Sequence, residues 1–150
     1  MIRKLKSILL GDAAFAATAE NPEDRKKLAL AALLVEMARA DFDPQQSEHN
    51  EIADLLAKQF ELSPVEAGLL IDRAKAANNK AVSLFDFTRA LHECLNADEK
   101  RDVIRMLWQV ANADLRLDKY EDYLVHKIAD LLYVSHSDVM RLKHEVADRT

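Results

Sequence analysis

Hydrophobic residues recur along most of the chain at intervals of three and four positions, between short polar segments. This spacing places apolar side chains on one face of an α-helix. The composition suits closely packed helices too, with 49% hydrophobic residues, 2 Gly and 3 Pro. The sequence therefore predicts an all-α fold, a single-domain bundle of about seven to eight helices. The residues expected in the core are Leu30, Leu33, Leu34, Met37, Ile52, Leu55, Leu56, Phe60, Leu69, Leu70, Ala74, Leu84, Phe87, Leu91, Leu95, Leu124, Ile128, Leu131, Leu132, Val139, Leu142 and Val146.

Residues that begin helices stand directly before several of these segments. Asn21, Asp43 and Ser63 are each followed by proline, which is favoured at the first helical position. Asn96 and Ser135 precede later segments and carry the same kind of side-chain oxygen, which accepts a backbone N–H at a helix start. We therefore expect helices to begin at these five residues.

One stretch of the sequence occurs twice. Residues 33–48 recur at 106–121, an offset of 73 positions, and each copy ends a helical stripe with Ala-x-Ala-Asp and a Glu seven residues later. Ser63 and Ser135 lie 72 positions apart, so the repeat continues into a third helix with one net deletion. This duplication predicts two three-helix units, related by a pseudo-twofold axis, with a bridging helix between them. The identical pairs are Leu34 and Leu107, Ala38 and Ala111, Ala40 and Ala113, Asp41 and Asp114, and Glu48 and Glu121.

The first twenty residues lie outside this repeat. Residues 1–10 carry Ile2, Leu5, Ile8 and Leu9 on one helical face, with Arg3, Lys4 and Lys6 opposite. An Ala-rich linker, residues 11–20, follows. We predict an N-terminal amphipathic helix and linker over 1–20 and a helical domain over 21–150. The short helix is expected either to strap onto the domain or to make a weak peripheral membrane contact.

Charge and cysteine content narrow the classes of partner and compartment. A net charge of −5 disfavours nucleic acid and favours cations or basic protein partners. The single cysteine, Cys94, excludes an internal disulfide and is expected to be a small buried apolar residue. The apolar run at Ile8 is too short for a signal peptide, and no stretch reaches the ~20 apolar residues of a membrane span. A cytoplasmic protein is expected.

The acidic residues of the two repeated turns are the strongest candidates for chemistry. Hard divalent cations such as Ca²⁺ prefer carboxylate and carbonyl oxygens, which a helix-to-helix turn supplies. Neither turn is an EF-hand, because the sixth position lacks Gly and the twelfth lacks Glu. Helix capping explains Asp43 and Asp118 fully. Capping does not explain why Asp41 and Asp114, which precede the cap residues, are each followed by a Glu at the same distance. The candidates are Asp41, Asp43, Glu48 and Glu51 in the first turn and Asp114, Asp118, Glu121 and Asp122 in the second.

Catalytic interpretations find little support. The five histidines form neither the Glu-x-x-His pairs of di-iron bundles nor a His-Glu-x-x-His zinc helix, and they are expected at surfaces or helix ends. With 2 Gly in the chain, a phosphate-binding loop is absent. Trp108, Tyr120 and Tyr123 could line a pocket, although aromatic residues at helical spacing are usually part of the core. We expect no catalytic residues and no enzyme.

The repeated motifs resemble the TerB-like family, small helical domains associated with tellurite resistance and also found at the start of a membrane-anchored DnaJ-type co-chaperone. The resemblance covers roughly residue 26 to the end, and the order of segments is most similar to a stand-alone bacterial subfamily. It implies a pseudo-twofold helical bundle without enzymatic activity. It also implies an acidic surface that binds calcium or a related metal, with Asp41, Glu48, Asp114 and Glu121 as ligands. The family usually has Asp-Gly at the turn, whereas Phe42 and Leu115 follow the aspartates in this sequence. The motifs are residues 37–41, 85–88, 106–114 and 129–135.

Two functional hypotheses follow. The first is a non-enzymatic TerB-like protein of a tellurite or stress-response system, whose duplicated acidic turns bind Ca²⁺ or another divalent cation. The second is an acidic helical protein–protein interaction module that docks a basic partner without metal. A metal-dependent hydrolase ranks far behind both, because no separate general base accompanies the acidic turns.

Overall fold

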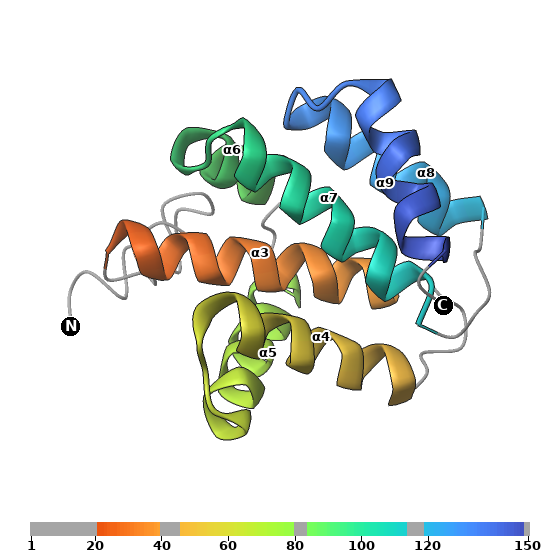
Figure 1. The fold of residues 1–150 in the computed structure, drawn as a ribbon. Helices are drawn as coiled ribbons and strands as arrows, with labels where there is room; N and C mark the ends of the chain where they lie inside the picture. The colour runs from red at the N-terminus through yellow and green to blue at the C-terminus, as the bar shows by residue number, and fades with distance from the viewer. Residues whose placement is uncertain (1–20, 40–45, 80–83, 114–118, 149–150) are drawn as a thin grey trace.

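The computed structural model describes residues 21–39, 46–79, 84–113 and 119–148. Within these ranges all regular structure is helical, which confirms the predicted all-α class (Figure 1). The predicted amphipathic helix and linker of residues 1–20 lie outside the described residues, so both stay predictions. Among the helices that are described, none has the length and apolar character needed to cross a membrane. The helices are α3 (Pro22–Arg39), α4 (Gln46–Phe60), α5 (Pro64–Asn79), α6 (Leu84–Cys94), α7 (Ala97–Ala111), α8 (Lys119–Leu131) and α9 (His136–Asp148).

Helix α3 is the centre of the bundle. Every residue from Leu28 to Val35 is buried, as is Met37, because apolar residues surround this part of the helix on all sides. α3 packs most closely against α5 and α6, and it contacts α4, α7 and α8 as well. The remaining helices are therefore arranged around α3 (Figure 1).

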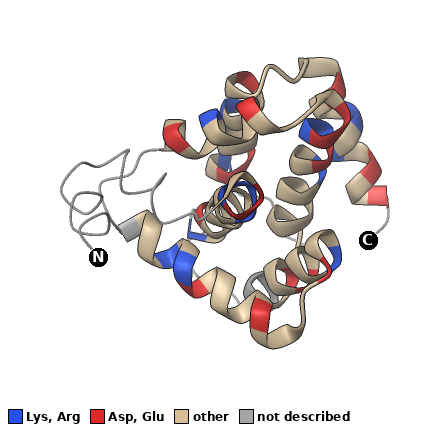
Figure 2. Cartoon of the chain, turned by 90° about the vertical axis from the view of Figure 1, so that its left-hand side faces the viewer, with Lys and Arg blue, Asp and Glu red and all other residues tan. Residues whose placement is uncertain are grey.

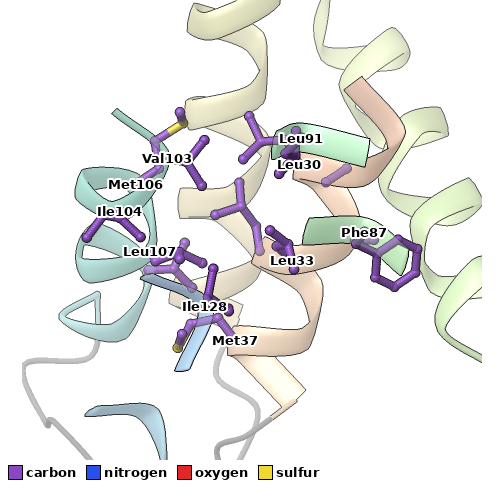
Figure 3. Close-up of a cluster of buried hydrophobic side chains, with 14 of the residues drawn as sticks. Leu30, Leu33, Met37, Phe87, Leu91, Val103, Ile104, Met106, Leu107 and Ile128 are labelled. Carbon is purple, nitrogen blue, oxygen red and sulfur yellow. The ribbon is translucent and has the colours of Figure 1, made fainter. Parts of the chain in front are cut away.

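A single core joins the two halves of the chain. Figure 3 shows Leu30 and Leu33 of α3 close to Leu91 of α6, with the apolar side chains of α7 and Ile128 of α8 beside them. Each large side chain of this kind contributes about 1.5–3 kcal/mol when it is fully buried. Basic and acidic residues are interspersed along the helices, and neither sign is confined to one part of the described chain (Figure 2).

The two three-helix units pack on each other reciprocally. The first comprises α3, α4 and α5, the second comprises α7, α8 and α9, and α6 lies between them in the sequence. The first helices of the units, α3 and α7, pack together, while α4 contacts α7 and α8 contacts α3. This exchange of contacts is what the predicted pseudo-twofold repeat requires.

The turns that join the second and third helices of each unit have the same geometry. Glu61 and Tyr133 adopt left-handed backbone conformations, with φ of 54° and 61°. The next N–H then reaches back to close the helix, from Leu62 to the Ala57 carbonyl at 3.0 Å and from Val134 to the Ala129 carbonyl at 2.9 Å. Both are Schellman-type helix ends, 72 positions apart.

Four of the five predicted helix starts are confirmed. The side chain of Asn21 accepts the backbone N–H of Asp24 at 2.8 Å, and Ser135 accepts that of Asp138 at 3.2 Å. Ser63 and Asn96 form complete capping boxes, in which Glu66 and Glu99 accept the N–H of the cap residue in return. The fifth, Asp43, lies outside the described residues.

The offset between the units changes after the first helix. In α3 and α7 the buried positions match at 73, whereas in the later helices they match at 72. The deletion therefore falls between the first and second helices of a unit, ahead of Ile52 and Leu124. The matching buried pairs are Leu33 with Met106, Met37 with Val110, Ile52 with Leu124, Leu56 with Ile128, Ala67 with Val139, Leu70 with Leu142 and Ala74 with Val146.

Most predicted core residues are buried or partly buried, but two expectations were wrong. Leu69 is 59% exposed, because α5 is apolar on both sides and Ile71 takes the inward position with Leu70. Cys94 is exposed, because α6 ends at this residue and the following Leu95 turns toward the core instead.

Candidate functional site

The structure describes only part of the predicted cation sites. Asp41, Asp43, Asp114 and Asp118 lie outside the described residues. Glu48 falls within α4, but its side chain is likewise not described. The three candidates with described side chains are Glu51, Glu121 and Asp122.

Glu121 is fully buried, with 0% of its surface exposed. It is the third residue of α8 and shares the inner face of that helix with Leu124, Val125 and Ile128. Removing a carboxylate from water costs several kcal/mol unless hydrogen bonds or opposite charge meet it, although a helix N-terminus lowers that cost. Glu121 and Thr88 are the two polar residues that are buried within the described ranges.

Asp122 is held by the neighbouring helix. Its carboxylate lies 2.9 Å from Lys143 Nζ of α9 and 3.8 Å from His126 Nε2 of its own helix. Lys143 also lies over the Trp108 ring, 5.3 Å from its centre. These contacts fasten α8 to α9, and the ammonium group makes the position unfavourable for a second cation.

Glu51 is a weak ligand candidate on electrostatic grounds. Partial burial raises the pKa of this carboxyl and the nearby Asp54 raises it further, while Lys58 lowers it. A raised pKa means that the surroundings disfavour the charged form, which is the form that binds a cation.

The change of offset separates two glutamates that match in the sequence. α4 is continuous from Gln46 to Phe60, so the offset of 72 seen at Ile52 extends back through the helix. At that offset Glu121 corresponds to His49, and Glu48 corresponds to Tyr120. Glu48 and Glu121 are therefore one helix position apart in the repeat.

No group of three His, Cys, Asp or Glu side chains that could hold a metal ion is found in the ranges that the structure describes. The four aspartates of the predicted sites lie elsewhere in the chain, so the metal site stays a prediction.

The aromatic candidates do not form a common pocket. Trp108 is fully buried and donates its indole N–H to the Val139 carbonyl of α9 at 3.1 Å, as expected for a core residue. Tyr120 and Tyr123 are 50% and 58% exposed, because they lie on the side of α8 away from Glu121 and Leu124. Sequence periodicity alone did not separate the buried ring from the two exposed rings.

Of the histidines with described positions, His92, His136 and His144 are exposed as predicted, whereas His126 lies in the middle of α8. His126 is half-buried, and its ring meets the Trp108 edge at 6.0 Å and stacks on His136 at 5.3 Å. His92 and His144 are exposed, and the His92 ring lies 4.9 Å from that of Tyr133.

The family comparison reaches every described helix, in whole or in part. A family model described as Tellurite resistance protein TerB matches residues 27–144, more than three quarters of the chain. The chain belongs to the TerB family. The TerB match begins in α3 and ends in α9, so both repeat units and the bridging helix α6 lie within it. Neither the search of curated proteins nor the search of solved structures gave a match.

Proposed function

We propose that this TerB-family chain is a non-enzymatic binding protein of a tellurite-resistance or stress-response type. We further propose that its second acidic turn, from Asp114 to Glu121, binds a divalent cation such as Ca²⁺. The observation that carries the proposal is the complete burial of Glu121 where that turn joins α8. A glutamate at the end of an acidic turn is a typical calcium ligand, and a bound ion compensates for the desolvation of its carboxylate.

The two turns are not proposed as equals. The offset of 72 places His49 where the second unit has Glu121. A histidine is a poorer ligand for a hard cation than a carboxylate. The first turn, with Asp41 and Glu48, is therefore proposed as the weaker of two sites. Glu51, Asp122 and the cap residues Asp43 and Asp118 stay secondary candidates.

Thermal unfolding with calcium and with EGTA tests the metal proposal. An ion at 100 times its Kd stabilises the folded state by about 2.7 kcal/mol, so the parent chain should melt at a higher temperature in millimolar calcium. Glu121→Gln and Asp114→Asn should lose that increase and be no less stable than the parent in EGTA. Glu48→Gln is the matched control and should keep most of it. If calcium does not shift the melting of the parent, the metal proposal fails.

A second candidate function is an acidic protein-interaction module without metal. It is favoured by the exposed Tyr120 and Tyr123, whose rings lie 6.3 Å apart at the start of α8. Exposed tyrosines of this kind are enriched at the centres of protein interfaces. In this case Tyr123→Ala should weaken binding to a basic protein partner to the same extent in calcium and in EGTA. Loss of binding in EGTA alone would favour the cation instead.

A further inference from the structure

The outer side of α5 is apolar although it faces solvent. Val65 is 72% exposed and Leu69 59% exposed, and they lie one helical turn apart on the same side of the helix. Ala76, two turns further on, is exposed on that side as well. We call these three residues the α5 outer face. It is separate from the inner face of α5, where Ala67, Leu70 and Ala74 pack on the core.

The corresponding side of α9 is polar. At the offset of 72, the residues opposite Val65, Leu69 and Ala76 are Ser137, Arg141 and Asp148, and all three are exposed. The two helices share the same fold position and the same pattern of buried residues. The fold itself therefore does not require apolar residues on this side, and the α5 outer face needs another explanation.

Acidic residues flank the α5 outer face. Glu61 and Glu66 are exposed beside it, and Asp72 is exposed on the same side of α5, between Leu69 and Ala76. Glu66 accepts hydrogen bonds from the Ser63 backbone and hydroxyl, which keep its carboxylate ionised. Of the basic neighbours, Arg73 pairs with Asp24 at 3.6 Å, and Lys75 is exposed. An apolar pair, Val65 and Leu69, with acidic residues beside it and one turn further along the helix suits a basic amphipathic helix.

The chain contains such a segment close by. Residues 1–10 combine Ile2, Leu5, Ile8 and Leu9 with three basic residues, Arg3, Lys4 and Lys6. The ion pair between Asp24 and Arg73 shows that the first turn of α3 lies against the middle of α5. Residues 11–20 span up to about 33 Å when extended, more than the ~24 Å length of a 16-residue helix such as α5. A tether of this length gives the segment a millimolar effective concentration at α5.

We propose that residues 1–10 of the same chain dock as an amphipathic helix on the α5 outer face. Ile2, Leu5 and Leu9 would cover Val65 and Leu69, and the basic residues would lie beside Glu61, Glu66 and Asp72. This contact would lie on the outside of α5, and the core packing of the domain does not depend on it. Removing residues 1–10 should therefore leave the domain folded and expose the α5 outer face to solvent.

Backbone amide NMR on the full chain and on a chain lacking residues 1–10 tests the proposal. Shift differences should concentrate in residues 61–76 of the first unit and be absent from residues 136–148 of the second. The variant Val65→Ser with Leu69→Arg gives α5 the residues of α9. In that background, removing residues 1–10 should no longer change the α5 signals. Tyr120→Ser with Tyr123→Arg is the matched control, since it removes two exposed apolar side chains elsewhere and should leave the differences intact.

Three outcomes would overturn the proposal. Shift differences that are absent, or that map away from α5, would show that the segment does not dock there. Concentration-dependent changes at α5 that persist without residues 1–10 would assign the face to a second copy of the chain. If anionic vesicles bind the segment equally well in the parent and in the Val65→Ser, Leu69→Arg variant, with α5 signals unchanged in both, a membrane contact would replace it.

Discussion

The two repeat units share the same helix-start and helix-end signals. They differ on the outer side of their third helix and at one position near the start of their second helix. Both units close their second helix with a left-handed residue and open their third with a serine cap. They differ on the outer side of the third helix, which is apolar in α5 and polar in α9. They also differ at the start of the second helix, where Glu121 is buried at the position matched by His49. Duplication has thus preserved the local signals of the fold, and the two differences coincide with the two binding sites that we propose.

The units also differ in how their first and third helices are held together. α3 and α5 are joined mainly by apolar packing, with a hydrogen bond from Asn78 to the Ala32 carbonyl at 3.2 Å and an ion pair between Arg73 and Asp24 at 3.6 Å. α7 and α9 are joined by polar side chains as well, including an Arg105 to Glu145 pair at 2.7 Å. The buried Trp108 adds its hydrogen bond to Val139. The second unit therefore depends more on specific side-chain contacts.

The largest expected effect comes from the paired positions Trp108 and Val35, which match at the offset of 73. Trp108→Ala should lower the free energy of unfolding by about 3–5 kcal/mol, because it leaves a large cavity between α7 and α9. Val35→Ala should cost about 1–3 kcal/mol. Trp108→Phe, which keeps a ring and loses the hydrogen bond, should cost about 1 kcal/mol. Urea unfolding measures the free energy of unfolding of all three variants. If Trp108→Ala and Val35→Ala lose the same free energy, the second unit does not depend more than the first on specific side-chain contacts.

A smaller effect is expected at the serine caps. Ser63→Ala and Ser135→Ala should each cost about 1 kcal/mol. The Ser63 change should cost more, because the Ser63 hydroxyl also hydrogen-bonds the Glu66 carboxylate, whereas the Asp138 carboxylate pairs with Arg101 and Arg141 instead. Thermal unfolding of the two variants makes the comparison. A larger loss for Ser135→Ala would show that this hydroxyl–carboxylate bond in the first unit has little effect.

The smallest effect is a difference in pH dependence. Hydrogen bonds from Ser63 hold the pKa of Glu66 below its ordinary value of 4.5. The lowered pKa means that the ionised carboxylate stabilises the fold above pH 4.5, and that this contribution is lost as the pH falls through the folded-state pKa. Glu66→Gln keeps a capping side chain but should slightly lower the melting temperature at pH 7 and not below pH 3.

The same experiment on Glu51 should have the opposite sign. Partial burial raises the pKa of Glu51, so its contribution is present below its ordinary pKa and is lost as the pH rises through the folded-state pKa. Glu51→Gln should therefore be neutral or slightly stabilising at pH 7. A loss of stability at pH 7 would indicate that the carboxylate has a partner that requires its charge.

Local chemistry made much of this fold predictable from the sequence. The caps at Asn21, Ser63, Asn96 and Ser135 depend on residues within three positions of each other, so the sequence contains all the necessary information. The core positions of α9 follow equally well from periodicity, whereas in α3 periodicity gave one buried side and missed the burial of the other. Leu69 was predicted wrongly because α5 is apolar on both sides, and periodicity cannot then select the inner one.

The candidate site was less predictable because it depends on register. Identical residues at the offset of 73 suggested that Glu48 and Glu121 are equivalent, and the helix ends at Glu61 and Tyr133, 72 positions apart, show that the offset of 72 already applies to the second helices. The complete burial of Glu121 had a sequence signal, since it lies three and seven residues before Leu124 and Ile128 on one helical face. That signal was hidden because a charged residue is normally assigned to the surface.

The contacts between helices of different units determine how the chain can be divided. α3 packs against helices of both units, and α4 lies against α7. A cut between α5 and α6 therefore separates α3 from α6, α7 and α8, and separates α7 from α3 and α4. We expect neither fragment to fold alone and the two to assemble when mixed, as a complementing pair. Each fragment could be fused to a different protein. Recovery of helical structure would then show that the two fused proteins lie close together.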